Sequence, residues 1–255
     1  MTAPLTAATI TRLEKVAADN GFDLPLPRQG DWLGFASTQA PLSIWLTAFG
    51  ERLFIAALSQ HNVARALRDH GVILAGPLPE GAVGGRTVAD IPALHRLARR
   101  AFQLSRTLPD ELLHAFEAQT AGLPRTTEAE RLVVQRVGQD LFRKGLLDYW
   151  EGRCAITALA VTELLRASHI KPWAECALDA ERLDVFNGLL LAPHLDAVFD
   201  RGFITVADDG AVRVSSLLGE GDRGALGLDR PLRVRALGAG HRSYLAWHAE
   251  HVFRP

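Results

Sequence analysis

The chain has 255 residues, a net charge of −1 and 48% hydrophobic residues, which is the composition of an ordinary globular protein with a sizeable core. It lacks a run of about 18 apolar residues, and its first residues, MTAPLTAATITRLEK, lack the pattern of a signal peptide, so neither a membrane span nor secretion is expected. Cys154 and Cys176 form no CxxC pair, which argues against a disulfide framework or a zinc ribbon and favours a reducing cytoplasm.

The basic residues are unusually rich in arginine, since only 3 of the 28 are lysine. Arginine suits bidentate contacts with phosphate, but a compositional bias of the whole proteome explains the same numbers. The near-zero net charge argues weakly against non-specific nucleic-acid binding, which usually uses a basic surface. Charge alone therefore does not decide the function.

The first half of the chain predicts a small α+β domain. Residues 5–20 have the pattern of an amphipathic helix that stops at Asn20-Gly21. Three β-like stretches joined by two turns predict a meander. These stretches are 32–38, 42–48 and 52–58, with turns at 39–41 and 49–51.

Further helices are expected at 61–71 and within 91–121, on either side of a Gly/Pro-rich loop at 76–86. The stretch AGLPRTT, residues 121–127, is the expected linker. It divides the chain into an N-terminal domain, residues 1–121, and a second domain, residues 122–255.

The second half begins with a capping box from Thr127 to Glu130, which predicts a long helix that ends near Trp150. Short strands, a helix from Pro193, a hairpin and a last amphipathic helix are expected after it. The strands are 154–157, 164–169 and 188–191, the hairpin is 203–215 and the last helix is 241–253. The loop-rich stretch 217–240 has no assigned role.

Four polar residues in this half have the spacing of a metal-dependent active site. His169 ends a strand before a Lys-Pro turn, and Asn187 follows a polar loop. Asp196 and Asp200 are four residues apart, so a helix places both on one face, where two like charges repel each other. A cation between them would remove the repulsion, and oxygen ligands suit Mg²⁺ or Mn²⁺.

Residues 127–255 resemble the HNH nucleases, whose fold wraps a β-ribbon and a helix around one divalent ion (the ββα-metal fold). The core motif spans residues 153–206. The matching positions are Gly138-Gln139, Phe142-Arg143, Leu146-Leu147, Trp150, Arg153-Cys154-Ala155, Thr157, 167–173, 181–184, 187–191, 194–197 and 199–202.

The resemblance implies a role for each of the four polar residues. His169 stands at the position of the general base, and Asn187 would hold the loop and orient the His169 ring. Asp196 and Asp200 would bind the metal ion, one Mg²⁺ or Mn²⁺ per site. The family's reaction leaves 5′-phosphate and 3′-hydroxyl ends. Ser168 departs from the wider family, which often has a metal-binding Asp or His before the base.

Other residues near this motif have two open interpretations. Lys171 and Arg201 are candidate phosphate contacts or solvated charges. His194 is a candidate metal ligand or substrate contact, or a surface residue at the start of its helix. Trp173 is expected to pack rather than to stack on a base. His248 and His251 have the spacing of a metal-binding pair on the last helix, but they are expected to cap that helix or lie on the surface.

The N-terminal domain is expected to recognise the target. Nucleases of this kind often carry a second domain that selects DNA, so this domain could read a modified base, by analogy. The stretch HRLARRAFQLSR places arginines on a helix, where they track a phosphate backbone or form an ordinary solvated face. These arginines are Arg96, Arg99, Arg100 and Arg106.

Together these features predict a two-domain α+β, metal-dependent DNA endonuclease of prokaryotic restriction or defence, located in the cytoplasm. Cutting both strands would require two sites, as in a homodimer. A non-catalytic DNA-binding regulator and an RNA-cleaving toxin are the alternatives. The intact set of His169, Asn187, Asp196 and Asp200 favours an enzyme over a regulator.

Overall fold

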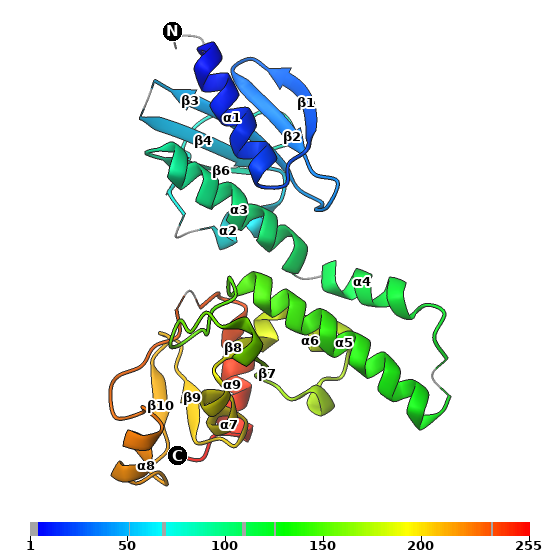
Figure 1. Cartoon of the computed structure of the whole chain (residues 1–255), viewed down its shortest axis with the longest axis vertical. Coiled ribbons are helices and arrows are strands. Elements are labelled where there is room, and N and C mark those ends of the chain that lie inside the picture. The colour runs from blue at the N-terminus through cyan, green and yellow to red at the C-terminus, as the bar shows by residue number, and fades with distance from the viewer. Residues whose placement is uncertain (1–4, 51, 68–69, 109–110, 125, 236) are drawn as a thin grey trace. The chain divides into compact units, whose positions relative to one another are not determined.

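The computed structural model describes residues 5–50, 52–67, 70–108, 111–124, 126–235 and 237–255. The chain forms two compact units, Met1–Leu108 and Pro109–Pro255. Each unit contains helices and strands, which confirms the α+β class (Figure 1). Glu51 of the expected meander turn and Arg125 of the expected linker lie outside the described residues. No helix in the described ranges has the length and apolar character that crossing a membrane requires.

The first unit is a six-stranded antiparallel sheet with the strand order β1-β2-β3-β4-β6-β5. The central strands β2, β3 and β4 form the expected meander. The sheet is formed by β1 (Leu24–Gln29), β2 (Trp32–Ala36), β3 (Ser43–Phe49), β4 (Leu53–Leu58), β5 (Val72–Ile73) and β6 (Gly84–Val88).

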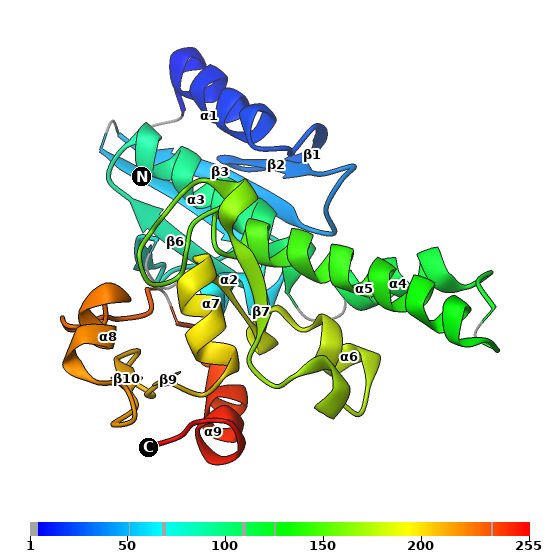
Figure 2. The ribbon, with the colours of Figure 1, turned by 60° about the horizontal axis from the view of Figure 1, so that its bottom comes forward.

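The helices of this unit are α1 (Ala7–Asp19), α2 (His61–Ala66) and α3 (Ile91–Thr107). Helices α1 and α3 lie across one face of the sheet (Figures 1 and 2). They bury apolar stripes at helical spacing, for example Leu13 and Val16 of α1 and Leu94 and Leu97 of α3.

The structure corrects the expected arginine stripe on α3. Arg96 and Arg99 are exposed, but Arg100 is buried, with 8% of its surface exposed. Arg106 lies over the ring of Phe102, 5.5 Å from its centroid. Arg100 therefore does not share a solvent-facing surface with Arg96 and Arg99.

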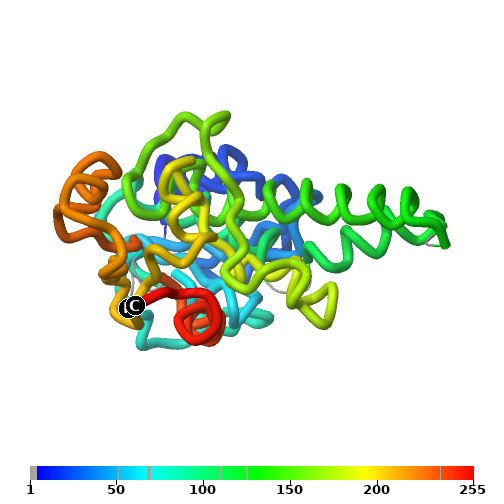
Figure 3. Tube along the Cα trace, turned by 90° about the horizontal axis from the view of Figure 1, so that it is seen from below, coloured from blue at the N-terminus to red at the C-terminus, as the bar shows by residue number. Residues whose placement is uncertain are grey.

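The second unit begins with α4 (Glu111–Thr120), which runs alongside the long helix α5 (Glu128–Tyr149; Figure 3). Thr127 and Glu130 form the expected capping box at the start of α5. Because α4 packs on α5, the division between the units lies one helix before the linker expected at 121–127.

The remaining elements surround two short antiparallel ribbons, β7 with β8 and β9 with β10. The strands are β7 (Arg166–His169), β8 (Gly188–Leu191), β9 (Ile204–Val206) and β10 (Val212–Val214). The helices are α6 (Asp179–Leu183), α7 (Pro193–Asp200), α8 (Glu220–Ala225) and α9 (His241–His251), with 3-10 turns at Thr162–Leu164, Trp173–Glu175 and Val185–Asn187.

Two local expectations in this unit were wrong. Residues 154–157 form a turn instead of a strand, because the Cys154 sulfur accepts the backbone N–H groups of Thr157 and Ala192. His248 is buried, with its ring stacked 4.0 Å from Phe199. Its Nε2 is hydrogen-bonded to the Phe199 carbonyl and its Nδ1 to the Thr205 hydroxyl. These bonds link α9 to α7 and β9. His251 remains largely exposed.

The buried histidines predict that the protein loses stability in mild acid. Burial lowers the pKa of both His241 and His248 to about 4, and the unfolded chain titrates near the ordinary value of 6.5. Between these values the unfolded state binds more protons, so acid favours unfolding. We expect the free energy of unfolding to fall by about 2 kcal/mol per histidine between pH 7 and pH 5.

Urea unfolding at the two pH values measures this change. The variant His248→Gln should lose about half of the pH dependence. Equal free energies of unfolding at pH 7 and pH 5 would show that neither histidine is held neutral by the fold.

Candidate active site

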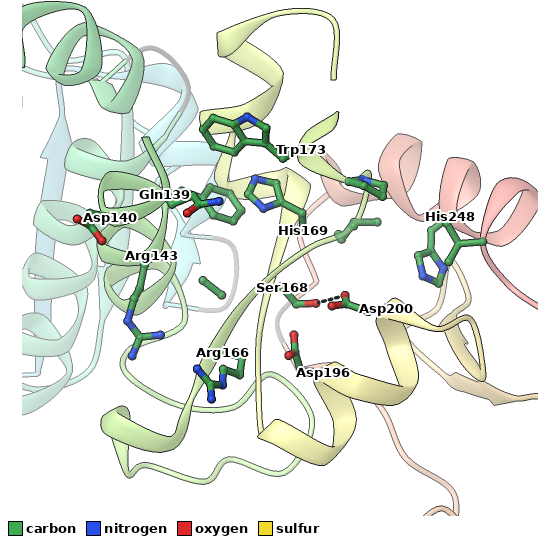
Figure 4. A pocket seen from close by; sticks show the side chains of 15 residues that line it. Gln139, Asp140, Arg143, Arg166, Ser168, His169, Trp173, Asp196, Asp200 and His248 are labelled. Carbon is green, nitrogen blue, oxygen red and sulfur yellow. Dashed lines mark hydrogen bonds between the residues drawn. The ribbon is translucent and has the colours of Figure 1, made fainter. Parts of the chain in front are cut away.

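Helix α5, strand β7 and helix α7 contribute most of the lining of one pocket of about 610 Å³. Successive side chains of a strand point to opposite faces, so Ser168 and His169 face different ways from β7. Figure 4 shows Ser168 turned toward Asp196 and Asp200, and His169 near Trp173 and Gln139. All six side chains line the same pocket.

Two carboxylates form one wall of this pocket. Asp196 and Asp200 are one turn apart on α7, and the Ser168 hydroxyl donates to Asp200 Oδ1 at 3.1 Å. Partial burial raises the pKa of both carboxyl groups, and the charge of Asp196 raises that of Asp200 further. The raised pKa values indicate that negative charge is incompletely balanced here.

These oxygen atoms fit a hard divalent cation. Mg²⁺ is commonly held by one or two carboxylates, with water and substrate phosphate completing its coordination. Asp196 and Asp200 fit such a donor set. Within the described ranges no three or more His, Cys, Asp or Glu side chains gather as a metal site, so the protein would supply two carboxylates.

The His169 ring is held on three sides. It stacks on Phe142 with centroids 3.8 Å apart, and the ring of Trp173 lies edge-on at 5.6 Å. Its Nε2 is 2.9 Å from the carbonyl of Arg182. A carbonyl only accepts, so Nε2 carries the hydrogen and the neutral ring keeps a lone pair on Nδ1. Burial lowers the pKa of His169, outweighing the Arg182 contact, and so favours this neutral form.

Residues 154–207 match a family model described as HNH endonuclease. This segment belongs to the HNH endonuclease family. The match contains β7, β8 and α7, and with them His169, Asn187, Asp196 and Asp200. The chain matches none of the curated proteins. Membership in the family supports nuclease activity in general, with nucleic acid as the class of substrate.

The amide of Asn187 in the HNH segment bonds the loop rather than the His169 ring. Its Oδ1 accepts the N–H of Lys171 at 2.8 Å, and its Nδ2 donates to the carbonyls of Lys171 and Glu181 at 3.2 and 3.1 Å. The ring is oriented by the carbonyl of Arg182. This partner could not be predicted from the sequence, because a backbone carbonyl leaves no signal in residue identity.

The Arg182 side chain fixes the loop that presents this carbonyl. Its guanidinium donates to the carbonyl of Trp173 at 3.2 Å, to the carboxylate of Asp179 at 2.8 Å and to the carbonyl of Cys176. Trp173 also packs against the backbone of α5 at Gly138. This arrangement favours packing as the role of Trp173.

The expected flanking contacts lie outside the pocket lining. Lys171 is paired with Glu181 at 3.2 Å, His194 is exposed on α7, and Arg201 is exposed at the end of the same helix. The basic residues that line the pocket are instead Arg143 and Arg166, which were not among the predicted site residues.

A substitution at Gly188 of the HNH segment is expected to act indirectly on the proposed base, His169. It lies opposite His169 in the ribbon, and a Cβ on it would lie 2.5 Å from the Phe142 ring. Gly188→Ala should displace Phe142 and the stacked His169 ring and destabilise the protein by roughly 1–3 kcal/mol. The ring signals of His169 in NMR spectra should shift. Gly122→Ala is the control, since its Cβ meets nothing within 4 Å; equal effects would contradict the prediction.

Proposed function

We propose that this protein is a metal-dependent DNA endonuclease that hydrolyses phosphodiester bonds. The observation that carries this proposal is one pocket that joins a neutral histidine, with a free lone pair on Nδ1, to a pair of carboxylates bridged to Ser168. The histidine, His169, is the general base, and the carboxylate pair, Asp196 and Asp200, is the cation site. Metal-assisted hydrolysis of a phosphodiester can use both, and membership in the HNH endonuclease family is consistent with it.

In this reaction His169 Nδ1 accepts a proton from water, and the resulting hydroxide attacks phosphorus. The P–O3′ bond breaks, and the 3′-oxygen takes a proton from solvent, leaving 5′-phosphate and 3′-hydroxyl ends. Asp196 and Asp200 would hold Mg²⁺ or Mn²⁺. When bound, the cation supplies positive charge that stabilises the phosphate and the leaving oxygen. The Arg182 carbonyl keeps the His169 ring in the required tautomer.

The first unit is proposed to select DNA, including modified DNA, within a prokaryotic restriction or defence function in the cytoplasm. This role rests on analogy and on Arg96 and Arg99, which are exposed on α3. A homodimer would bring two sites to the two strands of a duplex.

Purified protein and supercoiled plasmid test the function. Plasmids with plain or modified bases, and a single-stranded RNA, are incubated with Mg²⁺, with Mn²⁺ or with chelator. Metal-dependent nicking of DNA is the expected result. Cleavage of RNA alone would indicate an RNA-cleaving toxin. A shift of DNA on a gel without cleavage in any metal would indicate a DNA-binding regulator.

A further inference from the structure

Two arginines line the pocket, and they differ in how their charges are used. The Arg143 guanidinium donates to the carbonyl of Leu165 at 2.7 Å and to that of Thr162 at 3.0 Å. It therefore fastens the segment that leads into β7. Arg166 is exposed, and within the described residues its guanidinium makes neither a hydrogen bond nor an ion pair.

Arg166 lies on the cation side of the pocket. It is two residues before Ser168 on β7, so strand alternation places both side chains on the same face. Figure 4 shows Arg166 on the side of the pocket where Asp196 lies. The positive charge of Arg166 interacts electrostatically with the Asp196 carboxylate. One face of β7 thus meets the carboxylate pair and, beside it, carries the Arg166 guanidinium, whose charge is not used in a hydrogen bond or ion pair with a described residue.

We propose that Arg166 binds a phosphate of the cleaved strand, next to the cation site at Asp196 and Asp200. A phosphate oxygen can bond a guanidinium while another oxygen faces a metal ion, and the planar fork of arginine suits this contact. Lys171 and Arg201 are less suited, since Lys171 is paired with Glu181 and Arg201 is absent from the pocket lining. This inference rests on the proposed function of the site.

The alternative role for Arg166 is to stabilise the carboxylate pair. The two roles differ in their effect on metal binding. Loss of a positive charge beside Asp196 cannot weaken a cation's electrostatic attraction to the site, so Mn²⁺ affinity should stay the same or rise. If Arg166 instead supports the geometry of the site, its loss should weaken Mn²⁺ binding.

The test compares Arg166→Gln and Arg166→Lys with Arg242→Gln, a control that removes the same charge from an exposed position on α9 outside the pocket lining. For Arg166→Gln we expect kcat/KM for plasmid nicking to fall about 10–100-fold. Affinity for a labelled DNA duplex, measured in a His169→Ala background with Ca²⁺, should depend less steeply on salt. The slope of log K against log salt should decrease by about 0.9. Arg166→Lys should keep the slope and recover part of the rate.

The outcomes separate this inference from the proposed function. If Arg166→Gln matches Arg242→Gln in rate, affinity and salt slope, the phosphate contact is wrong. If it weakens Mn²⁺ binding, Arg166 is a structural residue and the inference is also wrong. If the unsubstituted protein cleaves no nucleic acid but Arg166→Gln still weakens DNA binding and lowers the slope, the phosphate contact stands and the nuclease does not.

Discussion

Replacement of His169 by alanine is expected to lower the rate of DNA cleavage by about 10²–10⁴-fold and to leave Mn²⁺ binding unchanged. The large effect follows from the position of the imidazole, since no other described histidine in the pocket lining has a free ring nitrogen. The other one, His248, uses both nitrogens in bonds to Phe199 and Thr205. Metal binding should survive, because Asp196 and Asp200 are on a different element, α7.

Single-turnover cleavage of a labelled duplex at saturating Mn²⁺ measures the rate, and a Mn²⁺ titration measures the binding. His251→Ala is the matched control, because this histidine is exposed on α9 and lies outside the pocket lining. If His169→Ala retains the unsubstituted rate, another group accepts the proton from water.

The pH dependence of cleavage is a second test of His169 as the base. Burial lowers the pKa of His169 below its ordinary value of 6.5, so the ring stays neutral to a lower pH than a free imidazole does. The base form is the active form, and the acid limb of the rate should therefore lie below pH 6.5. An acid limb above this value would mean that the environment of the bound complex favours the charged ring.

The polar residues of the site could be predicted from sequence, but their partners could not. Residue type and spacing marked His169, Asn187, Asp196 and Asp200, and the structure brings three of them to one pocket. Asn187 is buried, is not part of the pocket lining, and is bonded to the loop. The carbonyl of Arg182 was not predictable, because every residue has a carbonyl and only the fold decides which one meets the ring.

The fold was predictable where local pattern and tertiary packing agree. The capping box of α5 and the meander β2–β3–β4 have strong local signals. Strand β1 has the sequence LPLPRQ, and its two prolines fit only the edge position that it occupies. Strand β6 begins with two glycines and looks like a loop, but Gly85 lies against Leu74, where a Cβ would come within 3.0 Å.

Removal of both carboxylates, as Asp196→Asn with Asp200→Asn, is expected to abolish specific Mn²⁺ binding and metal-dependent cleavage. Loss of a residue that only hydrogen-bonds a metal ligand costs roughly 10–100-fold in metal affinity. Loss of the two charged ligands themselves should cost more. The same variant should be more stable than the unsubstituted protein without metal. The raised pKa values show that folding disfavours the two charges, and asparagine carries none.

Thermal unfolding with and without Mn²⁺ separates these two effects. Mn²⁺ should raise the Tm of the unsubstituted protein, since a ligand that binds only the folded state stabilises it, and should leave the Tm of the double variant unchanged. Asp208→Asn is the control, since it removes one carboxylate from an exposed position outside the pocket lining. A double variant that keeps the metal-induced rise would place the cation elsewhere. A double variant that loses the rise but is less stable without metal would show that the carboxylates support the fold around α7, as well as the ion.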